Sequence, residues 1–360
     1  MKPVPPLLNQ NLTRPNWLDA TPRDKNLIWL DKNENLDPTY ISWLNKKLSS
    51  KINGIDLSTY PDLKDIYLKL SKIENISPNQ ILLTAGSDGA IRTVFQSYIE
   101  PNDLVFITSP SFAMYDVYCK MYSAKSELIE YKNIKNKIFF DIEKLIRKIN
   151  KHKPKLVCIP NPDSPTGSVL ELFEIKNILE VCIKNKSILF IDEAYFYFYN
   201  KSSFKLLSDY GNNLIICRTF SKAWGLAGIR VGYLMSNSNS IEMMNKTRPM
   251  YEIGAMSLKI VSEILNHPNK MLESVKRIKA GKFYFENELK KMGFEVLETF
   301  GNFSHVKFGE LSNLIFKELD SIVYFRKDFN QECLKGYSRF SVAPRKIMKK
   351  IIDKIKNLKQ

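Results

Sequence analysis

The sequence predicts an α/β protein that combines a large domain, built on a mostly parallel sheet, with a small α+β domain. From about residue 80 to residue 235, short apolar runs alternate with helical patterns, which is typical of parallel strands covered by helices on both faces. A long charged segment from about Met271 to Met292 then suits an inter-domain helix. The chain has 360 residues, a length that suggests about two domains.

In chain order, residues 1–50 predict an arm with a helix near Tyr40–Ser50, which we expect to pack onto the small domain or a second subunit. The large domain should span residues 51–270 and the small domain residues 271–360. The predicted large-domain strands, each followed by a polar or glycine-containing turn, are Ile81–Thr84, Leu104–Thr108, Leu156–Ile159, Ile188–Ile191, Leu214–Cys217 and Arg230–Met235. The predicted small-domain strands are Phe294–Leu297, Phe303–Phe308, Ile322–Arg326 and Ser338–Val342, before a basic helix that continues to Lys359.

The chain is basic, with 54 lysine and arginine residues against 38 aspartate and glutamate residues and a formal charge of +16. A strongly basic protein can bind nucleic acid or a membrane surface. The lysines are spread from Lys2 to Lys359, however, and no zinc-finger, RNA-recognition or leucine-zipper signature accompanies them. We therefore expect a solvated basic surface that modestly favours phosphorylated small substrates, and no nucleic-acid partner.

The cysteines and histidines indicate neither a disulfide framework nor a metal site. The five cysteines are far apart and form no Cys-x-x-Cys pair, which is typical of a reducing compartment. The histidines His152, His267 and His305 have polar or loop-like neighbours, so we expect no histidine metal site and no catalytic triad. Because the sequence shows no signal peptide and no run of ~18 apolar residues, we expect a cytoplasmic protein without a membrane partner.

The segment Arg218–Arg230 places an amine, two hydroxyls and a guanidinium around one turn. The Lys222 amine can condense with an aldehyde to form a Schiff base, while Thr219, Ser221 and Arg230 can hold a dianion nearby. The cofactor that combines an aldehyde with a phosphate is pyridoxal 5'-phosphate (PLP). These residues resemble the Ser/Thr-x-x-Lys…Arg motif of fold-type I aminotransferases. The sequence Ser-Lys-Ala-Trp-Gly-Leu-Ala-Gly-Ile-Arg is most similar to that of the histidinol-phosphate aminotransferase branch.

Asp192 is the candidate acid opposite the pyridine nitrogen of the cofactor. It follows the apolar strand Ile188–Ile191, where a lone carboxylate is costly unless it meets a cation. In the family that the sequence resembles, this aspartate meets the pyridinium and the tyrosine three residues later donates to the ring hydroxyl, which implies these roles for Asp192 and Tyr195. A helix N-cap is the alternative for Asp192, and Glu193 fits a structural role better.

The resemblance implies three further cofactor contacts in the large domain. The turn containing Ser87 and Asp88 opens a helix, whose free amides can bind the phosphate, although Asp88 also suits a plain cap. Phe112 matches the aromatic residue that stacks on the pyridine face, with an ordinary core position as its alternative. Ser164 stands where the family's asparagine donates to the ring oxygen; being shorter, it reaches that oxygen through water, or Tyr195 supplies most of the contact.

The resemblance covers essentially the whole chain and implies the fold-type I arrangement of a large and a small domain. It also implies a homodimer, because Ser58-Thr59-Tyr60-Pro61-Asp62 resembles a segment whose tyrosine reaches the cofactor phosphate of the neighbouring subunit. In such a dimer Tyr60 completes the site of the second chain.

The implied reaction is transamination, with Lys222 moving the proton between Cα and the cofactor and glutamate as the amino donor. Arg339 and Arg326 resemble the pair that binds a substrate carboxylate or phosphate, and a planar guanidinium suits both anions. Surface arginines at strand ends are the alternative reading. The presence of both arginines favours a phosphorylated substrate. Histidinol phosphate is the first candidate substrate, and another phosphorylated ketone, such as dihydroxyacetone phosphate, is the second.

Two departures and two other functions keep the substrate and the reaction open. Val342-Ala343-Pro344 replaces a glycine-containing turn, and Asn33-Glu34-Asn35-Leu36 only partly matches the family's Asn-Glu-Asn-Pro arm. Decarboxylases of phosphorylated amino acids such as serine or threonine phosphate resemble this branch and use the same lysine, aspartate and arginines. A PLP-sensing regulator is a remote alternative, because the residues before Ser58 lack the helix-turn-helix that such a protein carries.

Overall fold

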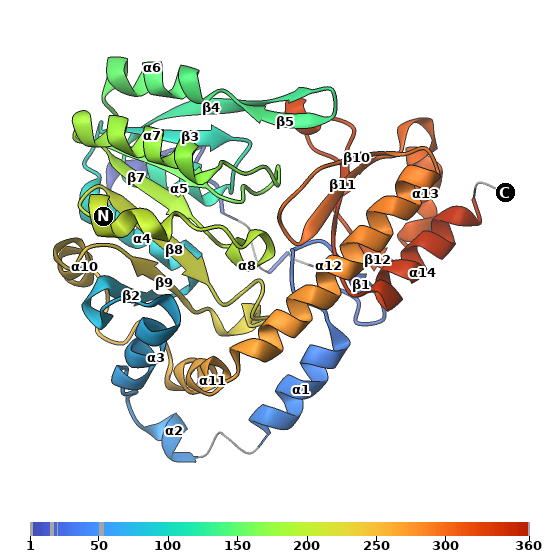
Figure 1. The fold of residues 1–360 in the computed structure, drawn as a ribbon, viewed down its shortest axis with the longest axis horizontal. Coiled ribbons are helices and arrows are strands. Elements are labelled where there is room, and N and C mark those ends of the chain that lie inside the picture. Colours follow the sequence, from blue (N-terminus) through green and yellow to red (C-terminus); the bar gives the residue numbers. More distant parts are fainter. Residues whose placement is uncertain (1–2, 15–17, 20, 50–53, 359–360) are drawn as a thin grey trace.

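The structure is a computed structural model that describes residues 3–14, 18–19, 21–49 and 54–358. Two units lie side by side in Figure 1, a large sheet with its helices and a smaller unit, and the long helix α12 (Pro268–Lys291) extends along both. None of the described helices is both long enough and apolar enough to span a membrane.

The larger unit contains a mostly parallel sheet, as the sequence predicted. Among the described residues the sheet has eight strands in the order β2-β9-β8-β7-β6-β3-β4-β5. Strands β4, β3, β6, β7 and β8 run parallel to one another, whereas β9 is antiparallel to both of its neighbours and β5 is antiparallel to β4. The strand bounds are β2 Ile81–Thr84, β3 Leu104–Ser109, β4 Lys125–Ile134, β5 Lys137–Phe140, β6 Leu156–Pro160, β7 Ile188–Asp192, β8 Leu214–Thr219 and β9 Gly232–Met235.

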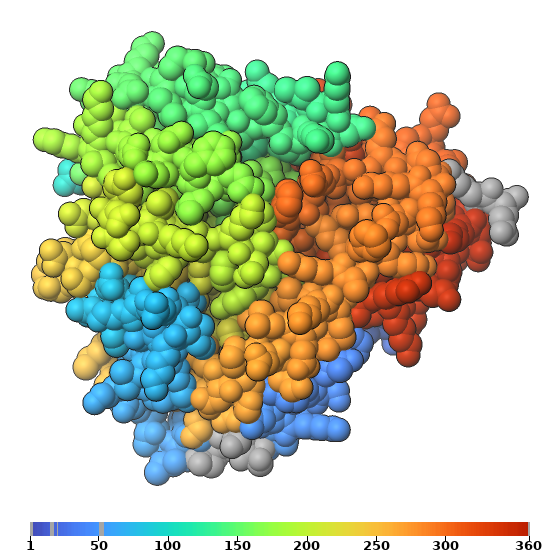
Figure 2. Space-filling model, in the orientation of Figure 1, coloured from blue at the N-terminus to red at the C-terminus, as the bar shows by residue number. Residues whose placement is uncertain are grey.

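All six predicted strands of this sheet are present, but one begins later than expected and two further strands were not predicted. The strand expected from Arg230 starts at Gly232, because Arg230 has a φ of 54° in the left-handed region, which cannot continue a strand. Strands β4 and β5 form a hairpin at the edge of the sheet, where exposed charged residues alternate with apolar ones. In the space-filling view this hairpin lies against the small unit (Figure 2), to which Asn133 donates a hydrogen bond at the Cys333 carbonyl oxygen.

Successive residues of a strand point to opposite faces of the sheet, and both faces of this sheet carry apolar side chains that helices cover. On one face Phe190 and Cys217 pack in a cluster with residues of α4 and α5, and on the other Ile191 and Ile216 pack with residues of α6 and α7. The helices of this unit are α2 Gly54–Ser58, α3 Lys64–Glu74, α4 Gly86–Tyr98, α5 Met114–Met121, α6 Ile142–His152, α7 Leu172–Lys184, α8 Phe196–Tyr199, α9 Leu207–Tyr210, α10 Ser238–Asn245 and α11 Ala255–Leu265.

The smaller unit contains a three-stranded antiparallel sheet, in the described part of the chain, with the order β10-β11-β13. Its strands are β10 Glu295–Leu297, β11 Phe303–Lys307 and β13 Ser338–Ser341. Helix α12 contacts β10 and β11, and α14 (Arg345–Lys356) contacts both α12 and α13 (Ser312–Leu319). The predicted strand Ile322–Arg326 is shorter than expected, as β12 (Val323–Tyr324), and belongs to a different pairing. The closing helix was predicted to continue to Lys359, a residue outside the described part of the chain.

The N-terminal arm packs onto the smaller unit, which is one of the two locations that the sequence predicted. Strand β1 (Ile28–Trp29) pairs in parallel with β12, and helix α1 (Pro38–Leu48) contacts α12 (Figure 1). The helix begins after Asp37, whose carboxylate accepts a hydrogen bond from the Thr39 amide as an N-cap. The predicted helix extended to Ser50, which is outside the described residues, as is the proposed start of the large domain.

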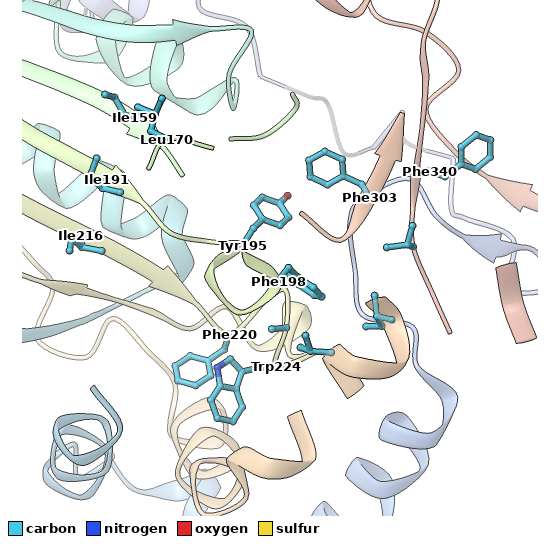
Figure 3. Close-up of a cluster of buried hydrophobic side chains, with 14 of the residues drawn as sticks. Ile159, Leu170, Ile191, Tyr195, Phe198, Ile216, Phe220, Trp224, Phe303 and Phe340 are labelled. Carbon is cyan, nitrogen blue, oxygen red and sulfur yellow. The ribbon is translucent and has the colours of Figure 1, made fainter. Parts of the chain in front are cut away.

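One apolar cluster joins the sheet to the smaller unit. Figure 3 shows side chains of the parallel strands continuing through Tyr195, Phe220 and Trp224 to Phe303 of β11. The rings of Tyr195 and Phe303 meet edge to face, with centroids 5.5 Å apart. The two units therefore share a packed core beside the carboxyl ends of the parallel strands, where ligands bind in sheets of this kind.

Candidate active site

A cavity of about 150 Å³ lies at the carboxyl ends of strands β6, β7 and β8. It brings together most of the residues that the sequence predicted as cofactor contacts, although they come from distant parts of the chain. The residues that line the cavity are Ser87, Asp88, Phe112, Pro160, Pro162, Ser164, Asp192, Ala194, Tyr195, Ser221, Lys222 and Arg230.

Lys222 presents its amine to this cavity from the turn after β8. Its Nζ atom donates a hydrogen bond to the carbonyl oxygen of Lys32, at 3.0 Å, and lies 5.6 Å from the centroid of the Tyr195 ring. Because this partner is a neutral main-chain carbonyl group, the contact is a hydrogen bond and not an ion pair. The amine is therefore placed to react with an aldehyde in the cavity.

Asp192 ends β7 with a buried carboxylate whose hydrogen-bond donors are neutral groups. The Ala194 amide donates to Oδ1 at 2.9 Å, and the Tyr115 hydroxyl donates to Oδ2 at 3.1 Å. Burial raises the pKa of Asp192, and these donors oppose that rise without abolishing it. A protonated ring nitrogen beside Asp192 would supply the cation that favours the ionised carboxylate.

The Tyr195 hydroxyl lies between the N-terminal arm and the loop after β6. It accepts a hydrogen bond from Asn33 Nδ2 at 2.9 Å and donates to Ser164 Oγ at 3.4 Å. Burial raises the pKa of Tyr195, but the positive charges of Lys222 and Arg339 and the Asn33 amide outweigh it, so the net shift is downward. The hydrogen bond from the Tyr195 hydroxyl to Ser164 is direct, although it is long. It places both side chains on the same side of the cavity.

An anion cradle forms where the turn after β8 meets the N-terminus of α4. Thr219 Oγ1 donates to Ser221 Oγ at 3.0 Å, and Arg230 Nη1 donates to the same Ser221 oxygen at 3.1 Å. Gly86 has a φ of +74°, and a Cβ atom there would lie 2.7 Å from Arg230 Nη2. The glycine therefore leaves room for the guanidinium beside the free amides that open α4, an arrangement that suits a phosphate.

Ser87, Asp88 and Phe112 complete the cavity wall. Ser87 and Asp88 lie in the first turn of α4, and the Asp88 carboxylate accepts a hydrogen bond from the Tyr118 hydroxyl at 3.1 Å. The Phe112 side chain is 43% exposed, so it is not the ordinary core phenylalanine that was its alternative reading. Its ring is free to cover a planar ligand in the cavity.

These groups fit PLP. The cavity offers an amine for the aldehyde, a buried acid for the ring nitrogen, a phenol for the ring hydroxyl and a cradle for the phosphate. Gly86 supports this most directly, because a side chain there would fill the space beside Arg230.

Arg339 and Arg326 do not line the cavity but lie beside it on the smaller unit. Their main chains exchange two hydrogen bonds, and both guanidinium groups face the Phe329 ring, at 5.9 and 4.2 Å from its centroid. Arg339 is 9% exposed, and among the described residues its buried Nε has no hydrogen-bond partner, while Nη2 donates to the Asp31 carbonyl oxygen. Burial and then the charge of Arg326 lower the pKa of Arg339, so an anion between the two arginines would be favourable.

Tyr60 lies away from the cavity of its own chain. Its side chain is 78% exposed and stacks on Tyr251, with ring centroids 4.3 Å apart. Exposure of two stacked aromatic rings is compatible with a role in another subunit, which stays a prediction.

The sequence did not point to Tyr115, Asn33 or His305, which contact the site residues. Tyr115 and Asn33 bind Asp192 and Tyr195, as described above, and His305 Nε2 donates to the Pro165 carbonyl oxygen at 2.6 Å, next to Ser164. Burial lowers the pKa of His305 to about 3, so the ring is neutral and holds the loop by a hydrogen bond alone. Tyr115 lies three residues after Phe112, at a helical spacing that resembles ordinary core.

Glu193 has the structural role that the sequence favoured. Its carboxylate is buried and accepts hydrogen bonds from Arg218 Nε at 3.0 Å and from the Ser203 amide at 2.7 Å. Arg218 also pairs with the buried Glu74, so these charges form one network beneath the site.

Comparisons with known proteins agree with this geometry. A sequence model of the family "Aminotransferase class I and II" matches residues 25–355. The chain is 32% identical over 316 residues to the histidinol-phosphate aminotransferase of Thermoanaerobacter pseudethanolicus, which covers 87% of this chain and 88% of that protein.

Two solved structures are similar over nearly their whole length. The histidinol-phosphate aminotransferase from Sinorhizobium meliloti in complex with pyridoxal-5'-phosphate has a TM-score of 0.79 at 20% identity, covering 93% of this chain and 92% of that chain. The L-threonine-O-3-phosphate decarboxylase from Porphyromonas gingivalis has a TM-score of 0.75 at 20% identity, covering 92% of this chain and 99% of that chain. At such identities these likenesses establish the fold, fold-type I, rather than the reaction.

The family match extends over both units, and the cavity at the carboxyl ends of the parallel strands carries the amine, the acid and the anion cradle that the family's cofactor needs. The chain therefore belongs to the aminotransferase class I and II family and is a pyridoxal-5'-phosphate-dependent aminotransferase.

Proposed function

We propose that the protein transfers an amino group between glutamate and a small phosphorylated keto or amino substrate, with histidinol phosphate and imidazoleacetol phosphate as the leading pair. The observation that carries this proposal is the position of Arg339, a buried arginine beside the wall of the Lys222 cavity, whose Nε atom has no hydrogen-bond partner in the described part of the chain. The chain's similarity to histidinol-phosphate aminotransferases supports the same substrate class. Dihydroxyacetone phosphate or another phosphorylated ketone would use the same arginines.

In this proposal each residue of the cavity has one task toward PLP. Thr219, Ser221 and Arg230 hold the phosphate, together with the amides of Ser87 and Asp88 at the start of α4. Asp192 keeps the ring nitrogen protonated, Tyr195 donates to the ring hydroxyl, and Phe112 stacks on the ring. When bound, PLP supplies an electron sink for the carbanion that forms when the substrate loses its Cα proton.

Lys222 carries that proton. For this task the Nζ atom leaves the Lys32 carbonyl oxygen, a single neutral hydrogen bond that is weak enough to exchange. Once free, the amine would take the proton from the substrate Cα and deliver it to the C4' carbon of the cofactor, acting as general base and then as general acid. Tyr195 is close enough to Lys222 for its ring to limit where the amine can move.

Arg339 and Arg326 bind the anionic end of the substrate. Arg339 is held by the Asp31 carbonyl oxygen and by two aromatic rings, so its guanidinium is already ordered before the substrate arrives. Arg326 is exposed and adds a second positive charge at the outer side of Phe329. A phosphate dianion would neutralise both charges, whereas a single carboxylate would neutralise one.

We also propose a homodimer in which Tyr60 reaches the phosphate site of the second chain. The exposed stack of Tyr60 on Tyr251 supports this proposal, because large exposed aromatic surface is more typical of an interface than of free surface. Mass measurement in solution tests it, and a monomeric protein with a full complement of cofactor would contradict it.

The reaction is tested by a half-reaction experiment on the purified protein loaded with PLP. The protein is mixed separately with glutamate, histidinol phosphate and phosphoserine, and its absorbance is followed between roughly 320 and 430 nm, where the cofactor's aldehyde-derived and amine forms differ. We expect glutamate and histidinol phosphate to convert the visible band to the near-ultraviolet band. If glutamate has no effect while phosphoserine is consumed with release of carbon dioxide, the protein is a decarboxylase instead.

A further inference from the structure

We propose that Asn33 is a positioning residue that turns the hydroxyl proton of Tyr195 toward the cavity, and that Ser341 fixes the orientation of the Asn33 amide. The proposal rests on the proposed role of Tyr195 as the donor to the ring oxygen of PLP. It adds a residue of the N-terminal arm and a residue of the smaller unit to the control of a cofactor contact.

The orientation of the Asn33 amide follows from its contacts with Ser341. Ser341 Oγ accepts a hydrogen bond from the Asn33 main-chain N–H at 2.7 Å and donates its own proton to Asn33 Oδ1 at 3.2 Å. Ser341 is fully buried, and Asn33 Oδ1 is the acceptor that its hydroxyl proton finds among the described residues, so the atom that faces Ser341 is the amide oxygen. The NH₂ group therefore faces the Tyr195 hydroxyl, at 2.9 Å.

The direction of the Tyr195 proton follows in turn. An amide NH₂ group can only donate, so the phenol oxygen accepts from Asn33 and its own proton has to point elsewhere. The acceptor that it finds is Ser164 Oγ in the cavity wall, at 3.4 Å, which is long for a hydroxyl donor. A better acceptor in the cavity, such as the ring oxygen of PLP, would take this proton.

The main chain around Asn33 has little freedom to change this geometry. Asn33 has a φ of 56°, in the left-handed region that asparagine tolerates better than most residues, and its carbonyl oxygen accepts a hydrogen bond from Asn302 at 2.9 Å. The carbonyl oxygen of Asp31, two residues earlier, accepts a hydrogen bond from Arg339. Asn33 is only 2% exposed, so water does not compete for its amide.

The same contacts link the substrate arginine to the cofactor tyrosine. Arg339 and Ser341 are two residues apart on β13 and therefore point to the same face of the sheet. The positive charge of Arg339 lowers the pKa of Tyr195. Ser341 is linked to the Tyr195 hydroxyl through its hydrogen bond to Asn33. A shift of β13 on substrate binding would reach the Tyr195 hydroxyl through this path.

The test is the pH dependence of the visible absorbance of the PLP-loaded protein, not its activity. A hydrogen bond donated to the ring oxygen stabilises the oxygen's negative charge and weakens its hold on the proton of the Lys222 Schiff-base nitrogen. Removing that hydrogen bond raises the pH midpoint of the spectral change. We expect Tyr195→Phe to raise it by about one pH unit or more, a tenfold change in the proton equilibrium, and Asn33→Ala to raise it by part of that amount.

The double variant carries the decisive result. If Asn33 acts through Tyr195, Asn33→Ala combined with Tyr195→Phe has the same midpoint as Tyr195→Phe alone. Asn237→Ala is the matched control, since it also removes an asparagine amide that both donates and accepts hydrogen bonds, to the Gly211 carbonyl oxygen and from the Ser240 amide, at the start of α10 and far from the cavity. Its midpoint should equal that of the unaltered protein, although its melting temperature falls.

Ser341→Ala is the second variant, for use if Asn33→Ala does not fold. It keeps Asn33 but lets the amide rotate, so its midpoint should also rise. An unchanged midpoint in Asn33→Ala, or in Ser341→Ala if that is the folded variant, overturns the inference, as does an additive shift in the double variant. An unchanged midpoint in Tyr195→Phe overturns the proposed role of Tyr195 itself, so the two failures can be told apart.

Discussion

Arg339→Ala should weaken the binding of phosphorylated substrates far more than Arg326→Ala, because the two arginines differ in burial. Arg339 is 9% exposed, and its Nε atom finds no hydrogen-bond partner within the residues that the structure describes, whereas Arg326 lies on the surface. Truncating one partner of a buried charge pair costs about 2–5 kcal/mol, which corresponds to roughly 30- to 4,000-fold in affinity. An exposed pair contributes about 0–1 kcal/mol, or at most roughly fivefold.

The assay is the concentration of histidinol phosphate that half-saturates the half-reaction, measured for both variants and for Arg339→Lys. The lysine variant keeps the charge but loses the planar fork, so it should lie between the unaltered protein and Arg339→Ala. Equal losses in Arg339→Ala and Arg326→Ala, or an unaltered half-saturation concentration in Arg339→Ala, would refute the reasoning. Melting temperatures separate a binding loss from unfolding, because Arg339 also holds the Asp31 carbonyl oxygen.

Three further predictions concern groups around the cavity. Arg218→Met leaves the buried carboxylates of Glu74 and Glu193 unpaired and should destabilise the protein by about 3–5 kcal/mol, seen as a lower melting temperature; an unchanged value would contradict it. Gly86→Ala should weaken PLP binding by roughly tenfold, because a Cβ atom would displace the Arg230 guanidinium from the anion cradle and weaken a charged hydrogen bond to the phosphate; equilibrium dialysis measures this. The left-handed conformation should also cost the folded protein about 1–2 kcal/mol with or without PLP. Burial raises the pKa of Asp163 to about 7, so the folded chain binds the Asp163 proton more tightly than the unfolded chain does. The protonated carboxyl therefore stabilises the fold fully below the pKa of Asp163 in the unfolded chain, and this stabilisation is lost as the pH rises toward 7. Asp163→Asn should therefore gain melting temperature relative to the unaltered protein from about pH 4 to pH 7, and a constant difference across that range would count against it.

The sequence predicted those strands that are buried on both faces. The run Ile188–Ile191 is entirely apolar because helices cover the sheet on both sides, and such runs stand out from their surroundings. Strand β4 was missed because it lies near the edge, where the exposed charged residues Glu130 and Lys132 alternate with apolar ones and resemble a solvated segment. The division into an arm, a large domain and a small domain at residues 50 and 270 stays a prediction.

The candidate site was predictable where its residues directly follow a strand. Asp192 ends β7 and Lys222 follows β8, so the parallel sheet alone brings them to one edge. Asn33 and His305 could not be found in this way, because each approaches the cavity from a segment more than a hundred residues away from its partner. Their contacts depend on how the arm and the smaller unit pack onto the sheet, which local patterns do not encode.

The most direct test of the central claim is to locate the covalent attachment of PLP. The PLP-loaded protein is reduced with borohydride, which fixes a Schiff base as a stable amine, and is then digested and mapped by mass spectrometry. We predict that the added mass lies on the peptide that contains Lys222, and that Lys222→Ala removes it while the protein remains folded. Attachment at another lysine, or none at all, would contradict the assignment of this cavity as the active site.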